Sequence, residues 1–117
     1  MSFNSIVKKL SLYLQVLEYV EDLKLFNTCA YGDEWNYKIA CPLFKDMFEF
    51  LTSESDVRVR FSFTHAKTTI KFLAHLGLFN ELKEQLTAHD YKSKDEREWN
   101  SSSFAGFGFN FTFILYE

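Results

Sequence analysis

The 117-residue sequence lacks any apolar run close to the roughly 18 residues that a membrane-spanning helix requires. It also lacks long runs of like charge, internal repeats and low-complexity segments. Its formal net charge of −3 argues against nucleic acid as a partner. The start of the chain has Lys8 and Lys9, but not the apolar centre and cleavage site of a secretory signal. The length and apolar content are those of one globular domain over residues 1–117.

Cysteine is scarce as well. The two cysteines, Cys29 and Cys41, have no histidine or further cysteine nearby at the spacing of metal ligands, so a zinc site is not expected. Three states stay open for them: two reduced thiols, a bond between the two in an oxidising compartment, or bonds to cysteines outside this chain.

Phenylalanine, in contrast, is abundant, with 14 residues. Each buried Phe contributes roughly 1.5–3 kcal/mol to stability. So many large rings are more typical of a segment that forms part of a larger hydrophobic core than of a small independent domain.

Apolar residues at three- and four-residue steps predict two helices in the first half of the chain. The first extends over residues 5–26, and its apolar stripe consists of Val7, Leu10, Leu14, Leu17 and Val20. A loop is expected over residues 27–40. The second helix begins at Cys41 and Pro42, because proline fits the first helical turn, and it ends in the polar residues 52–56. Its expected buried face consists of Phe44, Met47, Phe48 and Leu51.

The second half predicts strands around a third helix. Residues 57–64 alternate between apolar and polar side chains with a period of two, which is typical of a strand. The helix that follows His65 carries Ile70, Leu73 and Leu76 inward, and Gly77 is its expected C-terminal cap. A polar stretch over 81–103, helical at its start, leads to an aromatic strand over 107–116. The predicted fold class is therefore α/β, a partial sheet flanked by helices.

The junction of residues 64–67 is the candidate functional site. In open α/β sheets, ligands bind beyond the carboxyl ends of the strands, and this is where the clearest strand passes into a helix. The sequence here reads Arg60-Phe61-Ser62-Phe63-Thr64-His65-Ala66-Lys67-Thr68. It resembles the second signature of the histidine acid phosphatases, in which a strand is followed by His-Ala-Glu, then Thr and an apolar helix.

Further segments resemble the multiple inositol polyphosphate phosphatase branch of that family, in the same order along the chain. They are Val16–Lys24, Tyr31-Gly32 with Asn36, Cys41–Phe48, Leu86–Ala88 with Tyr91-Lys92, and Asn110 with Phe113–Tyr116. The likeness covers residues 16–116. It implies that residues 1–117 are the C-terminal part of a histidine acid phosphatase domain, with a histidine-phosphatase-like sheet.

The resemblance also implies a mechanism. In this family a histidine of an R-H-G-x-R motif takes the phosphoryl group, and the arginines of that motif hold its oxygens. The His of His-Ala-Glu donates a further hydrogen bond to the phosphate, and the Glu protonates the leaving alcohol. No metal or other cofactor takes part. By this resemblance His65 is the phosphate-binding histidine, and Lys67 occupies the position of the general acid.

Two departures from the family pattern bear on activity. No R-H-G-x-R motif is present, since none of His65, His75 and His89 is preceded by Arg or followed by Gly. The nucleophile is therefore absent from this sequence, and the chain alone is expected to be inactive. Lys67 replaces the acid, and a lysine at a helix start suits phosphate binding better than proton donation.

Other polar residues are weaker candidates. In the family this strand is apolar on both faces, a pattern that Arg58 and Arg60 break here, and the two arginines are interpreted as solvated charges. His75 is expected to be a packing or surface residue, and the pair His89-Asp90 a linker. Asn100-Ser101-Ser102 is a glycosylation sequon in an expected loop, whereas Asn110-Phe111-Thr112 lies in a predicted strand, where a glycan would not fit.

The sequence therefore predicts a phosphomonoester hydrolase that removes phosphate from inositol polyphosphates and 2,3-bisphosphoglycerate, present as a truncated chain. Its location is expected in the endoplasmic reticulum lumen, secreted or membrane-associated, by resemblance. The alternative is a non-catalytic descendant that keeps a phosphate-binding or partner-binding surface. An R-H-G-x-R motif encoded upstream of Met1 would favour the enzyme.

Overall fold

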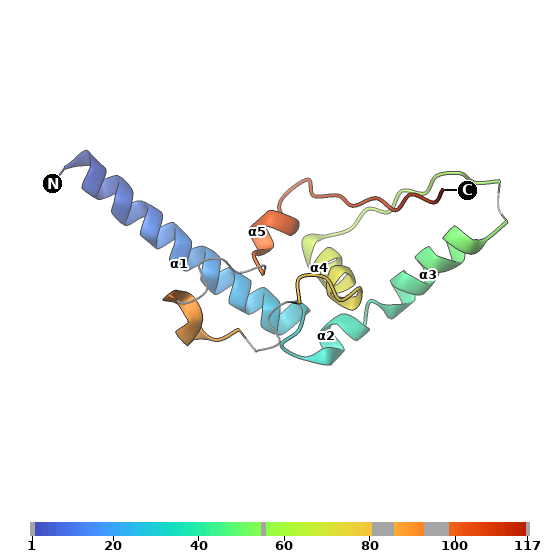
Figure 1. Cartoon of the computed structure of the whole chain (residues 1–117), viewed down its shortest axis with the longest axis horizontal. Helices are drawn as coiled ribbons and strands as arrows, with labels where there is room; N and C mark the ends of the chain where they lie inside the picture. The colour runs from blue at the N-terminus through green and yellow to red at the C-terminus, as the bar shows by residue number, and fades with distance from the viewer. Residues whose placement is uncertain (1, 55, 81–85, 93–98, 117) are drawn as a thin grey trace.

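Figure 1 shows a computed structural model of the chain, which describes residues 2–54, 56–80, 86–92 and 99–116. No glycine or proline occurs before Gly32, and the first helix, α1, runs unbroken from Phe3 to Cys29. This confirms the helix predicted over 5–26. None of the described helices is long and apolar enough to cross a membrane.

The buried face of α1 differs from the predicted one. The stripe Val7, Leu10, Leu14, Leu17 and Val20 is exposed throughout. The buried side chains instead belong to the C-terminal half and include Tyr19, Asp22 and Phe26. Only this half packs against α2, α4, α5 and the 3-10 helix η1, whereas the N-terminal half extends away from them.

A short helix, α2 (Glu34–Lys38), interrupts the segment predicted to be a loop. Asp33 caps it, since its Oδ1 accepts a hydrogen bond of 2.9 Å from the backbone N–H of Trp35. Glu34 and Lys38 form an ion pair of 2.8 Å one turn apart. This capping pattern is local and was missed because the helix is too short to show an apolar period.

Helix α3 runs from Cys41 to Thr52 with Pro42 in its first turn, which confirms the second predicted helix. The expected burial of its apolar face is wrong. Phe44, Met47 and Leu51 are only half-buried, and Phe48 is exposed. The ring of Phe44 packs on α4, 6.4 Å from that of Phe72, so α3 is held at one edge of the structure.

Helix α4 (Ala66–His75) confirms the third predicted helix. Ile70 and Leu73 are buried as expected, while Leu76 is half-buried. Gly77 adopts φ 77°, a conformation that glycine reaches without strain. Its N–H bonds to the carbonyl of Ala74, and the N–H of Leu78 to that of Leu73, which is the Schellman arrangement of a helix end.

The α/β class and the sheet are wrong. Within the described ranges every regular element is helical, and neither 57–64 nor 107–116 is a strand. Alternation predicts an extended backbone, but a strand also requires hydrogen bonds to a neighbouring strand. Residues 57–64 are exposed on both sides, with Phe63 95% accessible. The segment is extended coil.

The core lies where the end of α1 meets α4 and the segment after residue 98. Trp99 is its centre, 1% exposed, with ring centroids 5.4 Å from Phe26 and 5.1 Å from Phe104. Phe104 ends α5 (Ser101–Phe104), and η1 spans Ala88–Lys92. The helix predicted at the start of the polar stretch falls largely on 81–85, outside the described residues.

Both cysteines are free thiols, Cys29 buried and Cys41 exposed. Iodoacetamide applied to the folded chain should therefore alkylate Cys41 and spare Cys29, because the reagent reaches only the exposed sulfur. Peptide mass spectrometry locates the adducts, and alkylation in denaturant should label both. A Cys29–Cys41 disulfide peptide, or equal native labelling, would contradict this structure.

Candidate functional site

His65 stands at the start of α4, as the N-cap residue. Its backbone is extended, with φ −92° and ψ 156°, and its carbonyl accepts the N–H groups of Thr68 and Thr69 at 3.0 and 3.2 Å. The imidazole makes no capping hydrogen bond and is exposed. The backbone thus fixes the position of His65, while its ring nitrogens stay available to a ligand.

Lys67 lies in the first turn of α4 and is exposed. No acidic residue shares that turn. The first backbone N–H groups of a helix lack intrahelical acceptors, and the helix dipole places partial positive charge at this end. An ammonium group beside them makes the end of α4 favourable for an anion and unfavourable for an unneutralised lysine.

The other end of α4 is firmly held. Ile70 and Leu73 belong to the core, and the ring of Phe72 stacks on Phe111 at 5.3 Å. The hydroxyl of Tyr31 donates to the carbonyl of Leu78 at 2.5 Å, just past the helix. Burial, with a smaller contribution from Tyr37, raises the pKa of Tyr31 to about 12, so this hydroxyl keeps its proton. The start of α4 is therefore an exposed end of an anchored helix.

The arginines before the site have different surroundings. Arg60 pairs with Asp46 of α3 at 3.0 Å and lies over the ring of Phe50 at 5.4 Å. It therefore ties the extended segment to α3. Arg58 is exposed, in keeping with its interpretation as a solvated charge.

The other two histidines, His75 and His89, do not form a site with His65. His75 ends α4 and packs its ring 5.5 Å from that of Phe44, as expected of a packing residue. His89 is exposed in η1. Among the described residues no three His, Cys, Asp or Glu side chains gather as metal ligands would.

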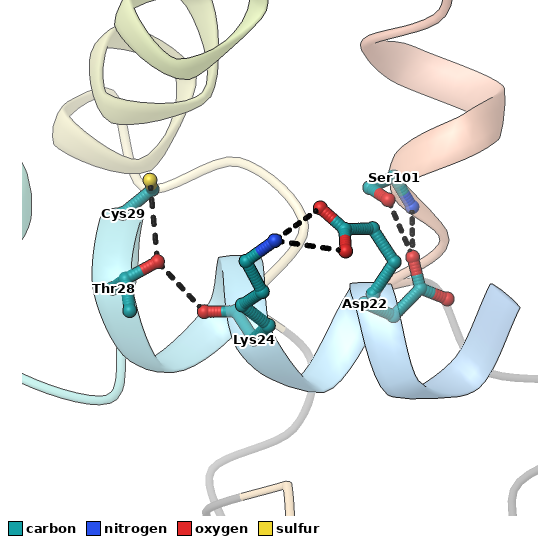
Figure 2. Close-up of polar contacts among 6 residues, drawn as sticks. Asp22, Lys24, Thr28, Cys29 and Ser101 are labelled. Atoms are coloured by element: carbon teal, nitrogen blue, oxygen red, sulfur yellow. Dashed lines mark hydrogen bonds and ion pairs between the residues drawn. The ribbon is translucent and has the colours of Figure 1, made fainter. Parts of the chain in front are cut away.

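A buried polar junction links α1 to α5, and sequence reasoning missed it. The side chain of Asp22 is fully buried, and its Oδ1 accepts the backbone N–H of Ser101 at 2.8 Å and the hydroxyl of Ser101 at 2.5 Å. Figure 2 shows these two side chains pointing toward each other across the two helices. The indole N–H of Trp99 donates to the Asp22 carbonyl at 3.0 Å. Asp22 therefore caps α5 from another helix.

A signal for this junction exists in the sequence. Tyr19, Asp22, Phe26 and Cys29 recur at steps of three and four, which places the aspartate on an otherwise apolar helix face. Such a residue is stable only with hydrogen-bond partners. The predicted apolar stripe leaves Asp22 out because that stripe runs along the other side of α1.

Replacing Asp22 with Ala should destabilise the chain by about 1–3 kcal/mol, because two buried donors of Ser101 lose their acceptor. Asp22→Asn keeps an oxygen acceptor and should recover part of the loss. The matched control is Glu21→Ala, which removes an exposed ion pair to Lys24 worth less than about 1 kcal/mol. Urea unfolding followed by Trp fluorescence measures all three, and equal midpoints for Asp22→Ala and Glu21→Ala would contradict the junction.

The two sequons also differ from expectation. Asn100 is half-buried at the N-cap of α5, and its Oδ1 accepts the Ser102 hydroxyl at 2.7 Å. Asn110 is exposed on extended coil, so the strand that was expected to exclude a glycan there is absent.

Comparisons with known proteins identify the family. Residues 8–117 match the model of the histidine phosphatase superfamily, branch 2, and the chain belongs to this family. Human multiple inositol polyphosphate phosphatase 1 is similar, with 33% identity over 112 residues, covering 88% of this chain and 23% of the human protein. The proteins of the same name from Drosophila melanogaster and Gallus gallus are both 31% identical, over 22% and 25% of their own lengths. No solved structure matches.

These comparisons confirm the resemblance drawn from the motifs. The chain spans about a quarter of the length of the curated relatives that it matches.

Proposed function

We propose that this chain supplies the C-terminal part, residues 1–117, of a histidine phosphatase domain that hydrolyses phosphomonoesters. The substrates are inositol polyphosphates and 2,3-bisphosphoglycerate, and the reaction passes through a phosphohistidine on an R-H-G-x-R segment that this sequence does not contain. The phosphatase name of the relatives supports this assignment.

The observation that carries the proposal is the placement of His65. It is an exposed residue at the start of a helix whose other end is anchored in the core. Its sequence, His65-Ala66-Lys67, resembles the second family motif. There it donates a hydrogen bond to the phosphate, and the N-terminal N–H groups of α4 add favourable electrostatics. A fixed donor of this kind stabilises the charge that develops on the phosphoryl oxygens.

Lys67 supports a second candidate function, a non-catalytic phosphate-binding protein. A lysine in a first turn that has no acidic residue holds phosphate as a point charge and is a poor general acid near neutral pH. In this reading the chain binds inositol phosphates or other small phosphomonoesters without cleaving them. By the same resemblance, we propose that the protein resides in the endoplasmic reticulum lumen, is secreted or is associated with a membrane.

A fusion protein separates the two functions. The N-terminal part of the human relative, up to the region that this chain matches, is joined to residues 1–117. If the chain is part of an enzyme, the fusion protein should release phosphate from inositol hexakisphosphate. It should also form an acid-labile phosphohistidine on the human segment. Binding of inositol hexakisphosphate in calorimetry without either signal would favour the binding protein.

A further inference from the structure

The N-terminal half of α1 carries an apolar surface that nothing in the described structure covers. We name it the α1 stripe. It follows one side of the helix at three- and four-residue steps, and all its side chains are exposed: Phe3, Ile6, Val7, Leu10, Tyr13, Leu14 and Leu17. Ser11 and Gln15 lie off the stripe, on a polar side of the same turns, and the exposed side chains of Leu12 and Val16 also lie off it. A run of exposed apolar side chains along a helix is typical of a surface that packs against a partner.

The α1 stripe faces a different direction from the side of α1 that packs within this chain. Continued by the same steps, the stripe reaches Glu21, Lys24 and Thr28, which are exposed, and Leu25, which is buried. The buried side passes through Tyr19, Asp22, Phe26 and Cys29 instead. The C-terminal half of α1 therefore packs in the core of this chain, while the apolar stripe on its N-terminal half contacts nothing in the described structure.

The shape of the whole chain agrees with a missing partner. Its radius of gyration is 18.0 Å, whereas a compact domain of this length has about 13 Å. The extended segments 57–64 and 107–116 also expose large apolar side chains, among them Phe61 and Ile114. Large apolar side chains exposed in three places are typical of surfaces that contact a partner.

We infer that the α1 stripe is a docking face for the rest of a histidine phosphatase domain, an inference that rests on the proposed function. The chain matches about a quarter of the relatives' length, so a larger body belongs to such a domain. A second copy joined through the stripe alone would leave both extended segments uncovered. A lipid surface is disfavoured, because Lys8 and Lys9 are the only charged side chains before Glu18, too few for strong attraction to anionic lipid.

The test supplies the rest of the domain as a separate polypeptide. The N-terminal part of the human relative is co-expressed with the full 117-residue chain, and the human C-terminal region serves as the positive control. A co-eluting complex is expected. Leu10→Asp with Leu14→Asp should weaken it roughly 30-fold or more, as loss of central apolar anchors does. Ser11→Asp with Gln15→Asp, on the polar side of the same turns, should leave it unchanged. Circular dichroism checks that each variant stays helical.

The outcomes separate docking from function. Co-elution that depends on Leu10 and Leu14, but without phosphate release, supports the docking face and counts against the proposed enzyme. A complex that is equally tight in both double variants overturns the docking face. So does no complex where the human control forms one, or stripe-dependent binding to a second copy or to anionic vesicles. In the fusion protein, the stripe variant should also unfold at a lower temperature than its polar-side control, and equal unfolding would overturn the inference.

Discussion

Lys67→Glu in the fusion protein should raise turnover of a substrate with a poor leaving group by about 10²–10⁴-fold, the usual contribution of a general acid. A carboxyl group can protonate the leaving alcohol, whereas the ammonium group of a lysine is a poor proton donor to an alcohol. The substitution also places an acidic side chain in the first turn of α4, where the helix dipole favours it and where the chain has none.

The leaving group provides the control for this substitution. An alkyl phosphate needs protonation as it departs, while an aryl phosphate with an acidic phenol does not, so only the alkyl ester should respond. Lys71→Glu, one turn further along α4, makes the same charge change away from the helix start. Equal turnover of the alkyl ester by the parent fusion protein and its Lys67→Glu variant would show that this position is not that of the acid.

The 117-residue chain by itself should release no phosphate above background. Its three histidines are not in an R-H-G-x-R setting, and the covalent route requires that nucleophile. A fixed hydrogen-bond donor and a helix end can bind phosphate but cannot replace the attacking group. Malachite green detection with inositol hexakisphosphate measures this. Release that disappears in His65→Ala would refute the requirement for a second segment.

Local signals predicted the helices well. The apolar period placed α1, α3 and α4, Pro42 marked the start of α3, and Gly77 marked the end of α4. These features act over one or two turns, so they do not depend on the rest of the fold.

Which side chains are buried, and whether a sheet forms, depends on distant parts of the chain. Local sequence patterns therefore could not predict either feature. Residues 57–64 have a strand pattern, but a strand forms only beside another strand. The Val7–Val20 stripe is truly apolar, yet the core formed on the other side of α1, around Trp99. The Asp22–Ser101 junction joins residues far apart in sequence, and the helical period of α1 can mark only Asp22, not its partner.

The sequence predicted that a helix begins just after His65, but it did not predict what surrounds this helix start. His65 and Lys67 stand at the start of a helix, as the motif indicated. The segment expected to precede them as a strand is extended coil, and neither it nor residues 107–116 forms a strand among the described residues.

The effect of His65→Ala on the fusion protein tests the central claim most directly, that the start of α4 binds the phosphoryl group. Loss of one such preorganised donor lowers kcat by about 10²–10³-fold. His89→Ala, an exposed histidine on η1, is the matched control and should retain full turnover. The expected result is a drop of that size for His65→Ala alone, with an unchanged melting temperature. Turnover of inositol hexakisphosphate that is the same in both variants would contradict the claim.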